Sequence, residues 1–415
     1  MRIKHAVLLS LVLFIGMILR LIWVGDMEYK TDEAYMFQKL LAVGHTEPWP
    51  WLGVSSGVYI RNPGMSVWIF LWLGKFIGAT TPTQLCRAVQ ILNCLAVALI
   101  VPFAFRFVEK AQREAWLWAA ALAAVNPFAI LYHRKIWAQS VLPFFVMLFL
   151  MSWWKRSSRL GAFFWGFIGA FLGQIHMSGF FLAFGFTLWA GLFDRKNVSW
   201  KNWFFGSCLG SLSLIPWIIH IFTVHTGHSA VFGIGEAVQF RYFVFWITDP
   251  LGLHLGNPLG VSNGNGVLQQ LGDFLRYPFA LGHATWLVGL AHVGVLLLAI
   301  RLVFSARWKE VMFAKGESAF AQNAALWGYG LVMTFATIHI YRFYLLVTFP
   351  FEFLWLARLG LSDRERGRLV LGLMVSFQLF ISGAFLYYIH VNGGAVHGDY
   401  GRSFRCQNID SCSSP

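Results

Sequence analysis

Residues 25–36 read Gly-Asp-Met-Glu-Tyr-Lys-Thr-Asp-Glu-Ala-Tyr-Met and follow directly on the first hydrophobic segment of the chain. Four of the eighteen carboxylates of the protein, Asp26, Glu28, Asp32 and Glu33, fall within this stretch. Acidic groups this dense beside hydrocarbon can coordinate a cation, act as a base, or decorate a solvated loop. The side of the membrane on which they lie therefore decides what kind of protein this is.

The composition is that of an integral membrane protein. Hydrophobic residues make up 58% and charged residues 12% of the chain, and the mean hydropathy is +0.61, whereas a soluble domain carries about 25% charged residues. The formal charge of +14 is spread over short loops, which is not the footprint of a nucleic-acid-binding protein. Segment 6–25 contains Arg20 and Trp23 near its end and no small-residue cleavage site, so we expect a retained first helix rather than a signal peptide.

Hydropathy predicts eleven spans, and the basic residues orient them. The predicted spans are 6–25, 85–107, 115–132, 138–154, 160–175, 178–193, 203–221, 284–304, 322–338, 343–360 and 369–389. A twelfth stretch, 64–79, is short and interrupted by Lys75, and we expect it to lie in the outer interface. Only then do all five basic clusters between spans fall on one side with the N-terminus. The sequence thus predicts an all-α polytopic plasma (inner) membrane protein, with a cytoplasmic N-terminus and an outer (periplasmic) C-terminus.

The predicted outer face collects most of the unusual polar residues. It receives the first loop 26–84 with its juxtamembrane helices, the turn His133-Arg134-Lys135, His176, the large loop 222–283, the turn 339–344 and the tail 390–415. The spans of the membrane domain, residues 1–389, carry almost no charge at mid-depth. Glu352 is the exception, and it can either pair with a neighbouring helix or mark a buried site.

The order of these motifs resembles that of the GT-C membrane glycosyltransferases, in particular the branch of the protein O-mannosyltransferases and the lipid A aminoarabinose transferases. One helix is followed by an outer loop in which the pair Asp32-Glu33 leads into an amphipathic helix, and the loop continues with Arg61-Asn62-Pro63-Gly64. Arg87 opens the second span, and the turns 132–135 and 341–344 are similar to later outer loops of the family. The second turn departs from the family pattern, because Gln139 or Ser140 stands where an Asp often follows the Arg.

The resemblance implies a GT-C-type bundle and a glycosyltransferase that moves a hexosyl or pentosyl group. The donor would be a polyprenyl-phosphate-linked sugar, and the acceptor a lipid, a glycan or a protein at the outer membrane surface. Such a reaction needs a carboxylate base for the acceptor hydroxyl and cations for the leaving phosphate. The candidate catalytic residues are Asp32 and Glu33. The candidate phosphate ligands are Arg134, Lys135, His133 and Arg342, and further substrate contacts are expected from Arg61, His176, Tyr341 and Tyr344. A divalent metal ion remains open as cofactor, with Asp32 as its ligand.

Each candidate also has a structural interpretation. Asp32 and Glu33 suit the first turn of a helix, where acids cap the free amides. Arg134 and Lys135 can anchor at the interface, His176 can be a hydrogen-bonded turn residue, and Tyr341 and Tyr344 belong to the aromatic belt. Asp26 and Glu28 are expected to be solvated rather than catalytic.

Two other function classes stay open. A flippase or transporter for lipid-linked glycans would carry charge along a central cavity, and the predicted spans are nearly uncharged. A polymerase of surface polysaccharides also uses outer arginines, but does not lead with an Asp-Glu loop after the first helix.

The polar tail holds Cys406 and Cys412, whereas Cys86, Cys94 and Cys208 lie in or beside spans. On an oxidising outer face the two tail cysteines can form a disulfide that staples the tail locally. Two free thiols in a disordered end are the alternative.

Overall fold

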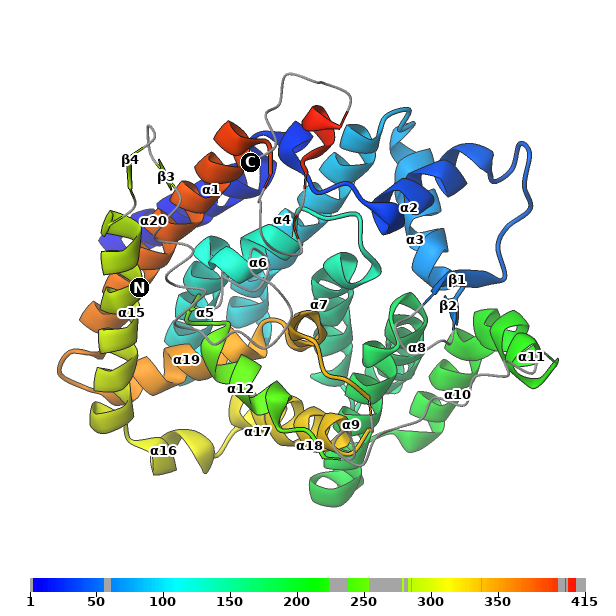
Figure 1. The fold of residues 1–415 in the computed structure, drawn as a ribbon. Helices are drawn as coiled ribbons and strands as arrows, with labels where there is room; N and C mark the ends of the chain where they lie inside the picture. The colour runs from blue at the N-terminus through cyan, green and yellow to red at the C-terminus, as the bar shows by residue number, and fades with distance from the viewer. Residues whose placement is uncertain are drawn as a thin grey trace.

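The computed structural model describes residues 3–55, 61–223, 238–253, 278–279, 283–284, 286–336, 338–394, 400 and 402–407. Helices dominate this part of the chain (Figure 1). The first half comprises α1 (Ile3–Leu21), η1 (Val24–Asp26), α2 (Thr31–Ala42), β1 (Leu52–Ser55), β2 (Arg61–Pro63), α3 (Met65–Ile77), α4 (Pro82–Phe107), η2 (Lys110–Gln112), α5 (Arg113–Val125), α6 (Pro127–Tyr132), η3 (Ala138–Val141), α7 (Leu142–Trp153), α8 (Arg159–Ile175), α9 (Ser178–Phe193), η4 (Arg195–Asn197), α10 (Trp200–Ser211), η5 (Leu212–Leu214) and α11 (Ile215–Thr223).

The second half continues the helical pattern. It comprises α12 (Arg241–Thr248), the short strands β3 (Pro278–Phe279) and β4 (His283–Ala284), α15 (Trp286–Ser305), α16 (Trp308–Met312), α17 (Glu317–Asn323), the π-helical η7 (Ala324–Tyr329), α18 (Gly330–Thr334), η8 (Arg342–Thr348), α19 (Phe351–Ser362), α20 (Gly367–Asn392) and η9 (Phe404–Cys406). Most of the predicted large loop 222–283 lies outside the described residues. Its described part contains α12, in agreement with the short helices expected there.

Each of the eleven predicted hydrophobic segments is helical over most of its length. A span needs about 20 apolar residues, and four helical segments in the described ranges meet this requirement: Pro82–Phe107, Trp200–Thr223, Leu287–Ser305 and Gly367–Asn392. A fifth is reached if η8 and α19, bent by 78° relative to each other, count as one span. The remaining apolar helices are shorter, so the number of eleven spans stays a prediction. Helix α3 has 13 residues, and its interfacial location also stays a prediction.

Two breaks within predicted spans have clear local causes. The segment 115–132 divides at Asn126, because Pro127 has no amide hydrogen to continue α5. The Asn126 side chain then accepts a hydrogen bond of 2.9 Å from the Ala129 amide and caps α6. The first span ends at Leu21, and Trp23 just beyond it adopts a left-handed backbone with φ 47°.

Helix α5 lies at the centre of the packed helices. It contacts α19, α1, α4 and α20, and its residues from Ala119 to Val125 are all buried. Alanines allow helix backbones to approach closely, which is how helices pack where lipid supplies no hydrophobic drive. A second packed group is formed by α8 with α10, α7 and α9.

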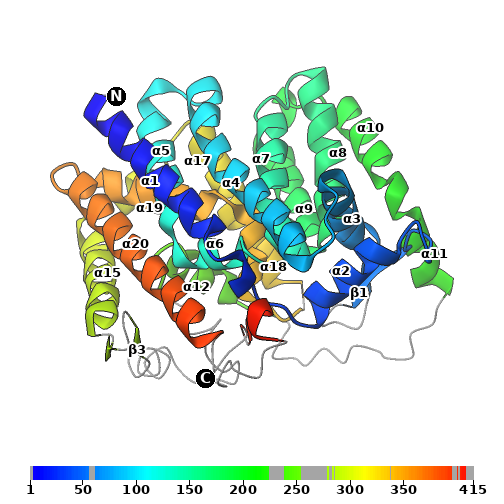
Figure 2. The ribbon, with the colours of Figure 1, turned by 90° about the horizontal axis from the view of Figure 1, so that it is seen from above.

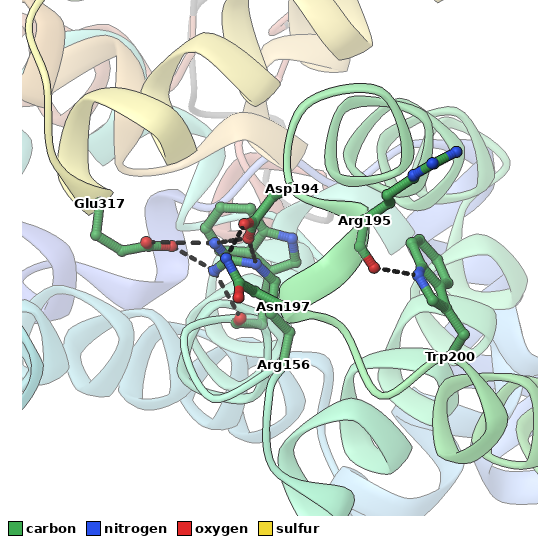
Figure 3. Close-up of polar contacts among 7 residues, drawn as sticks. Arg156, Asp194, Arg195, Asn197, Trp200 and Glu317 are labelled. Carbon is green, nitrogen blue, oxygen red and sulfur yellow. Dashed lines mark hydrogen bonds and ion pairs between the residues drawn. The ribbon is translucent and has the colours of Figure 1, made fainter.

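The interhelical turns fall into two groups at opposite edges of the molecule. In Figure 2 the N-terminus lies at the upper edge, whereas α2, β1 and the C-terminus lie at the lower edge. At one edge Arg156 forms ion pairs with both Asp194 and Glu317, which joins the turns after α7 and α9 to the start of α17 (Figure 3). At the other edge, contacts join the four segments that supplied most of the predicted site residues. They are the first loop, the turn 133–135, the turn at His176 and the turn 341–344. The grouping of the turns therefore agrees with the sequence, and the assignment of the second edge to the outer side stays a prediction.

Candidate functional site

The acidic stretch forms the connection between α1 and α2. After the left-handed Trp23, η1 turns the chain, and the Trp23 ring stacks on His390 of α20 with 4.1 Å between ring centroids. Helix α2 then begins at Thr31. Asp26 thereby contacts the end of α20, and Glu28 contacts the turn that follows α6.

Asp26 and Glu28 are buried, with 2% and 0% exposure, so the expectation that they are solvated is wrong. The Asp26 carboxylate contacts the Nδ1 of His390 at 2.7 Å and the Nε of Arg405 at 2.7 Å. A buried carboxylate is tolerated only when paired. Both partners come from the C-terminal end of the chain, which explains why the sequence did not reveal them.

Glu28 joins the first loop to the turn after α6. It lies 2.7 Å from the Nζ of Lys30 and forms an ion pair with Lys135. Lys135 is itself 1% exposed, and aromatic rings surround its ammonium. The ring centroids of Trp137, Tyr132 and Tyr400 lie 4.3, 5.1 and 5.7 Å away. Lys135 therefore neutralises Glu28 in a cage of ring faces, which favour a cation.

The first turn of α2 presents Asp32 to solvent and buries Glu33. One Glu33 oxygen accepts a hydrogen bond of 3.0 Å from the Lys30 amide, which confirms the capping interpretation for this residue. The other oxygen, Oε1, is buried and has no hydrogen-bond partner among the described residues. Burial and the nearby Glu28 charge raise the pKa of Glu33 to about 7. The side chain of Asp32 is exposed, but nearby protein atoms displace part of the water around its carboxyl, and this partial desolvation together with the Glu28 charge raises the pKa of Asp32 above its usual value.

Arg134 is placed differently from a phosphate ligand. Its Nη1 donates to the carbonyl oxygens of Leu19, Arg20 and Ile22 at 2.8, 3.1 and 2.7 Å. Its Nη2 donates to the carbonyl of Trp23 at 3.0 Å. The carbonyls of Leu19 and Arg20 belong to the last turn of α1, where helical partners are missing, and those of Ile22 and Trp23 follow directly, the latter also accepting from the Asp26 amide at 2.9 Å. The guanidinium thus caps α1, and its terminal nitrogens are occupied.

His133 and Lys135 are also held by the protein. His133 is fully buried and accepts a hydrogen bond of 3.1 Å from the Nε of Arg20 at its Nδ1. Desolvation lowers the pKa of His133 well below its usual value, so the ring is neutral. The three residues of this turn, expected to bind a phosphate together, instead hold α1 and Glu28.

Arg342 forms a buried ion pair with Asp249, with 2.8 Å between Nη2 and Oδ1 and 3.4 Å between Nε and Oδ2. The ring of Phe128 lies 5.1 Å from the guanidinium. Sequence reasoning missed Asp249, although its place before Pro250 in a polar loop was a signal. Burial raises the pKa of Asp249, and Arg342 opposes this effect.

The predicted aromatic and histidine contacts meet on the same face. The rings of Trp137 and Phe343 are 5.8 Å apart, and His176 lies 6.3 Å from Phe343 and 5.5 Å from Tyr344. His176 shares a hydrogen bond of 2.7 Å with Ser178, and burial lowers its pKa to about 4. Tyr341 is 45% exposed and stacks on Phe343. This group borders Lys135 through Trp137.

Arg61 lies apart from these contacts. It is exposed in β2, its Nε donates to the Gly53 carbonyl at 3.2 Å, and its own carbonyl accepts from the Trp217 indole at 2.7 Å. Arg87 donates to the Leu21 carbonyl and so also secures the end of α1.

The described residues do not fit a metal ion. A hard divalent cation takes about six oxygen ligands in proteins and solvent. Within the described ranges no group of three or more His, Cys, Asp or Glu side chains is arranged to hold one.

No protein-family model matches the chain, and no curated protein matches it. Two structures of an oligosaccharyltransferase from Archaeoglobus fulgidus align with it. The apo form is 15% identical over 93% of this chain, with a TM-score of 0.41. The complex of that enzyme with an inhibitory peptide and a dolichol-phosphate is 14% identical over 94%, with a TM-score of 0.40. The chain spans 55% of the length of each of these structures.

Proposed function

We propose that this protein is a membrane glycosyltransferase that moves a sugar from a polyprenyl-phosphate-linked donor to a lipid, glycan or protein acceptor at the outer membrane surface. The observation that carries the proposal is the placement of Asp32. It is exposed in the first turn of α2, next to a buried set of paired charges, and it makes no ion pair or side-chain hydrogen bond with another described residue. A rigidly framed, solvent-facing carboxylate is what a general base requires.

In the proposed reaction Asp32 takes the proton of the acceptor hydroxyl. The acceptor oxygen forms a bond to the anomeric carbon as the bond from that carbon to the phosphate oxygen breaks. The phosphate leaves with the electron pair, and the configuration at the carbon inverts. A raised pKa strengthens Asp32 as a base near neutral pH, and Glu33 fixes the turn that carries it.

The leaving phosphate needs a cation on the same face. Arg134 does not suit this role, because its terminal nitrogens donate to carbonyls at the end of α1. Lys30 does suit it, since its side chain is 42% exposed two residues before Asp32. Arg342 is the second candidate. A phosphate bound to it would take over the two-point contact that Asp249 makes with its guanidinium in the structure.

The test is transfer from a panel of radiolabelled polyprenyl-phosphate sugars to membrane extracts. Asp32→Asn should lower turnover by about 10² to 10⁴ while the protein inserts and purifies as the wild type does. Glu47→Gln is the matched control, because Glu47 is an exposed carboxylate after α2 that pairs only with Lys39 in the described contacts. Wild-type turnover of the Asp32→Asn protein would refute the assignment of the base. Failure of the wild-type protein to transfer any sugar would refute the proposed function.

A further inference from the structure

The C-terminal residues 400 and 402–407, here called the strap, lie on the acidic loop. The Phe404 amide donates to the Met27 carbonyl at 2.9 Å, and Ser403 forms an antiparallel bridge with Glu28. The Tyr400 hydroxyl donates to the Asp26 carbonyl. Figure 2 shows η9, the red turn of the strap, beside the start of the α2 segment. The strap thus adds main-chain hydrogen bonds to a loop that has no strand partner of its own.

The strap is also anchored at its other side. The Ser403 amide donates to the Gly393 carbonyl at 2.9 Å, and Arg402 forms a bridge with Gly394 just beyond α20. Tyr400, Ser403 and Cys406 are at most 2% exposed. This segment is therefore packed between α20 and the acidic loop rather than extending into solvent.

The charges of loop and strap are complementary. Asp26 is buried in the loop, and its two ion-pair partners, His390 and Arg405, both belong to the C-terminal part of the chain. The Phe404 ring meets Tyr29 edge to face at 5.0 Å. Removal of the Arg405 side chain would leave the buried Asp26 carboxylate with His390 as its remaining ion-pair partner. A buried carboxylate without full charge compensation destabilises the folded state. The loop therefore needs the strap to keep its observed conformation.

We propose that the strap is a positioning element that fixes the loop 26–33 and thereby the direction of Asp32, with Asp26 and Arg405 as its central contact. This inference rests on the proposed function for its catalytic consequence, and on the contacts alone for its structural part. Cys406 is buried and disulfide-bonded, which restrains the conformation of η9 itself, and the predicted partner Cys412 lies outside the described residues. The tail was predicted to be restrained only by a local disulfide. In the structure its described part also contacts the loop that leads to the candidate base.

The structural part is tested by hydrogen–deuterium exchange of the full-length protein in detergent. Arg405→Ala and Cys406→Ser should each raise exchange in peptides covering residues 26–33, with no change in peptides covering α5. Cys208→Ser is the control, since Cys208 is an exposed free thiol. A reductant should reproduce the effect in the wild-type protein and have none in the Cys406→Ser protein.

The catalytic part is tested by separating kcat from the KM for the donor. A displacement of about 1 Å at a reacting group can cost about 10²-fold. We therefore expect Arg405→Ala to lower kcat by about 10- to 100-fold with little change in KM. Arg405→Lys should recover part of the loss, because it restores the charge beside Asp26 without the planar fork.

Each outcome supports or overturns the inference. Unchanged exchange in residues 26–33 of both strap variants would overturn it, whatever the activity. Raised exchange with unchanged kcat would show that the strap holds the loop but does not position the base. Raised exchange in a protein that transfers no sugar would overturn the proposed function and leave the structural part standing.

Discussion

Arg134 offers the sharpest test of a structural role against a substrate-binding one. In the structure its guanidinium donates to four carbonyls at the end of α1, at 2.7 to 3.1 Å. A hydrogen bond from a charged group contributes about 1.5 to 3 kcal/mol net, and such contributions are not additive. Counting only two of the four, Arg134→Ala should lower the free energy of unfolding by about 3 kcal/mol or more.

The loss should be visible as a lower melting temperature in detergent, followed by intrinsic tryptophan fluorescence. At about 2.1 cal/mol/K per residue, 415 residues give an unfolding entropy of about 0.9 kcal/mol/K. A loss of about 3 kcal/mol then corresponds to a fall of about 3 °C. Arg134→Lys should recover only part of this shift, because a single ammonium cannot span the four carbonyls as the planar fork does.

A matched control is Arg195→Ala. Arg195 is exposed at the opposite edge, and its backbone carbonyl accepts a hydrogen bond from the Trp200 indole (Figure 3). Such a surface change should stay within about 0.5 kcal/mol. In the Arg134→Ala protein that remains folded, the KM for the donor should be close to the wild-type value. An unchanged melting temperature together with a KM raised 10-fold or more would refute the capping role and restore Arg134 as a phosphate ligand.

Two further predictions concern Glu33 and the topology. The folded-state pKa of Glu33 is raised to about 7, so its contribution to stability is full below the unfolded value of about 4.5 and is lost as pH rises toward 7. Glu33→Gln should therefore flatten the decline in melting temperature between these values, and an unchanged slope would contradict the shift. For the topology, cysteines introduced at the exposed positions Thr80 and Lys110 in a Cys208→Ser background should differ in reaction with a membrane-impermeant thiol reagent. Labelling at Thr80 alone agrees with an interfacial α3, and labelling at Lys110 alone would mean that α3 crosses the membrane.

The helices were predictable because their signals are local. Runs of apolar residues predicted the eleven long hydrophobic segments, each of which is helical over most of its length, and Pro127 and Pro82 lie at helix starts where proline is expected. The number of spans was harder to predict from the sequence. Hydropathy treats 343–360 as one segment, whereas η8 and α19 meet at 78° around Phe349 and Pro350. A window average does not detect a change of direction between two apolar helices.

The convergence of the outer turns was also predictable, since the distribution of basic residues placed them on one side. The structure joins Glu28 to Lys135 and Trp137 to Phe343 across that face. The individual pairings were not predictable, because each connects residues about 100 or more positions apart. Nothing near Asp26 in the sequence indicates that Arg405 and His390 will neutralise it.

The density of the acidic stretch explains why basic residues are paired with it in the structure. Four carboxylates within eight positions cannot all be buried unless cations enter with them. The structure divides them into two pairs. Asp26 and Glu28 are buried with His390, Arg405, Lys30 and Lys135, whereas Asp32 and Glu33 begin α2. A basic residue on an outer face suggested a phosphate ligand, because such residues are disfavoured there. For Lys135 the acidic loop itself supplies the reason, and for Arg134 the end of α1 does. Asp32 is exposed, and the pKa of Glu33 is raised to about 7, so the two carboxyl groups in the first turn of α2 are the candidates for proton transfer.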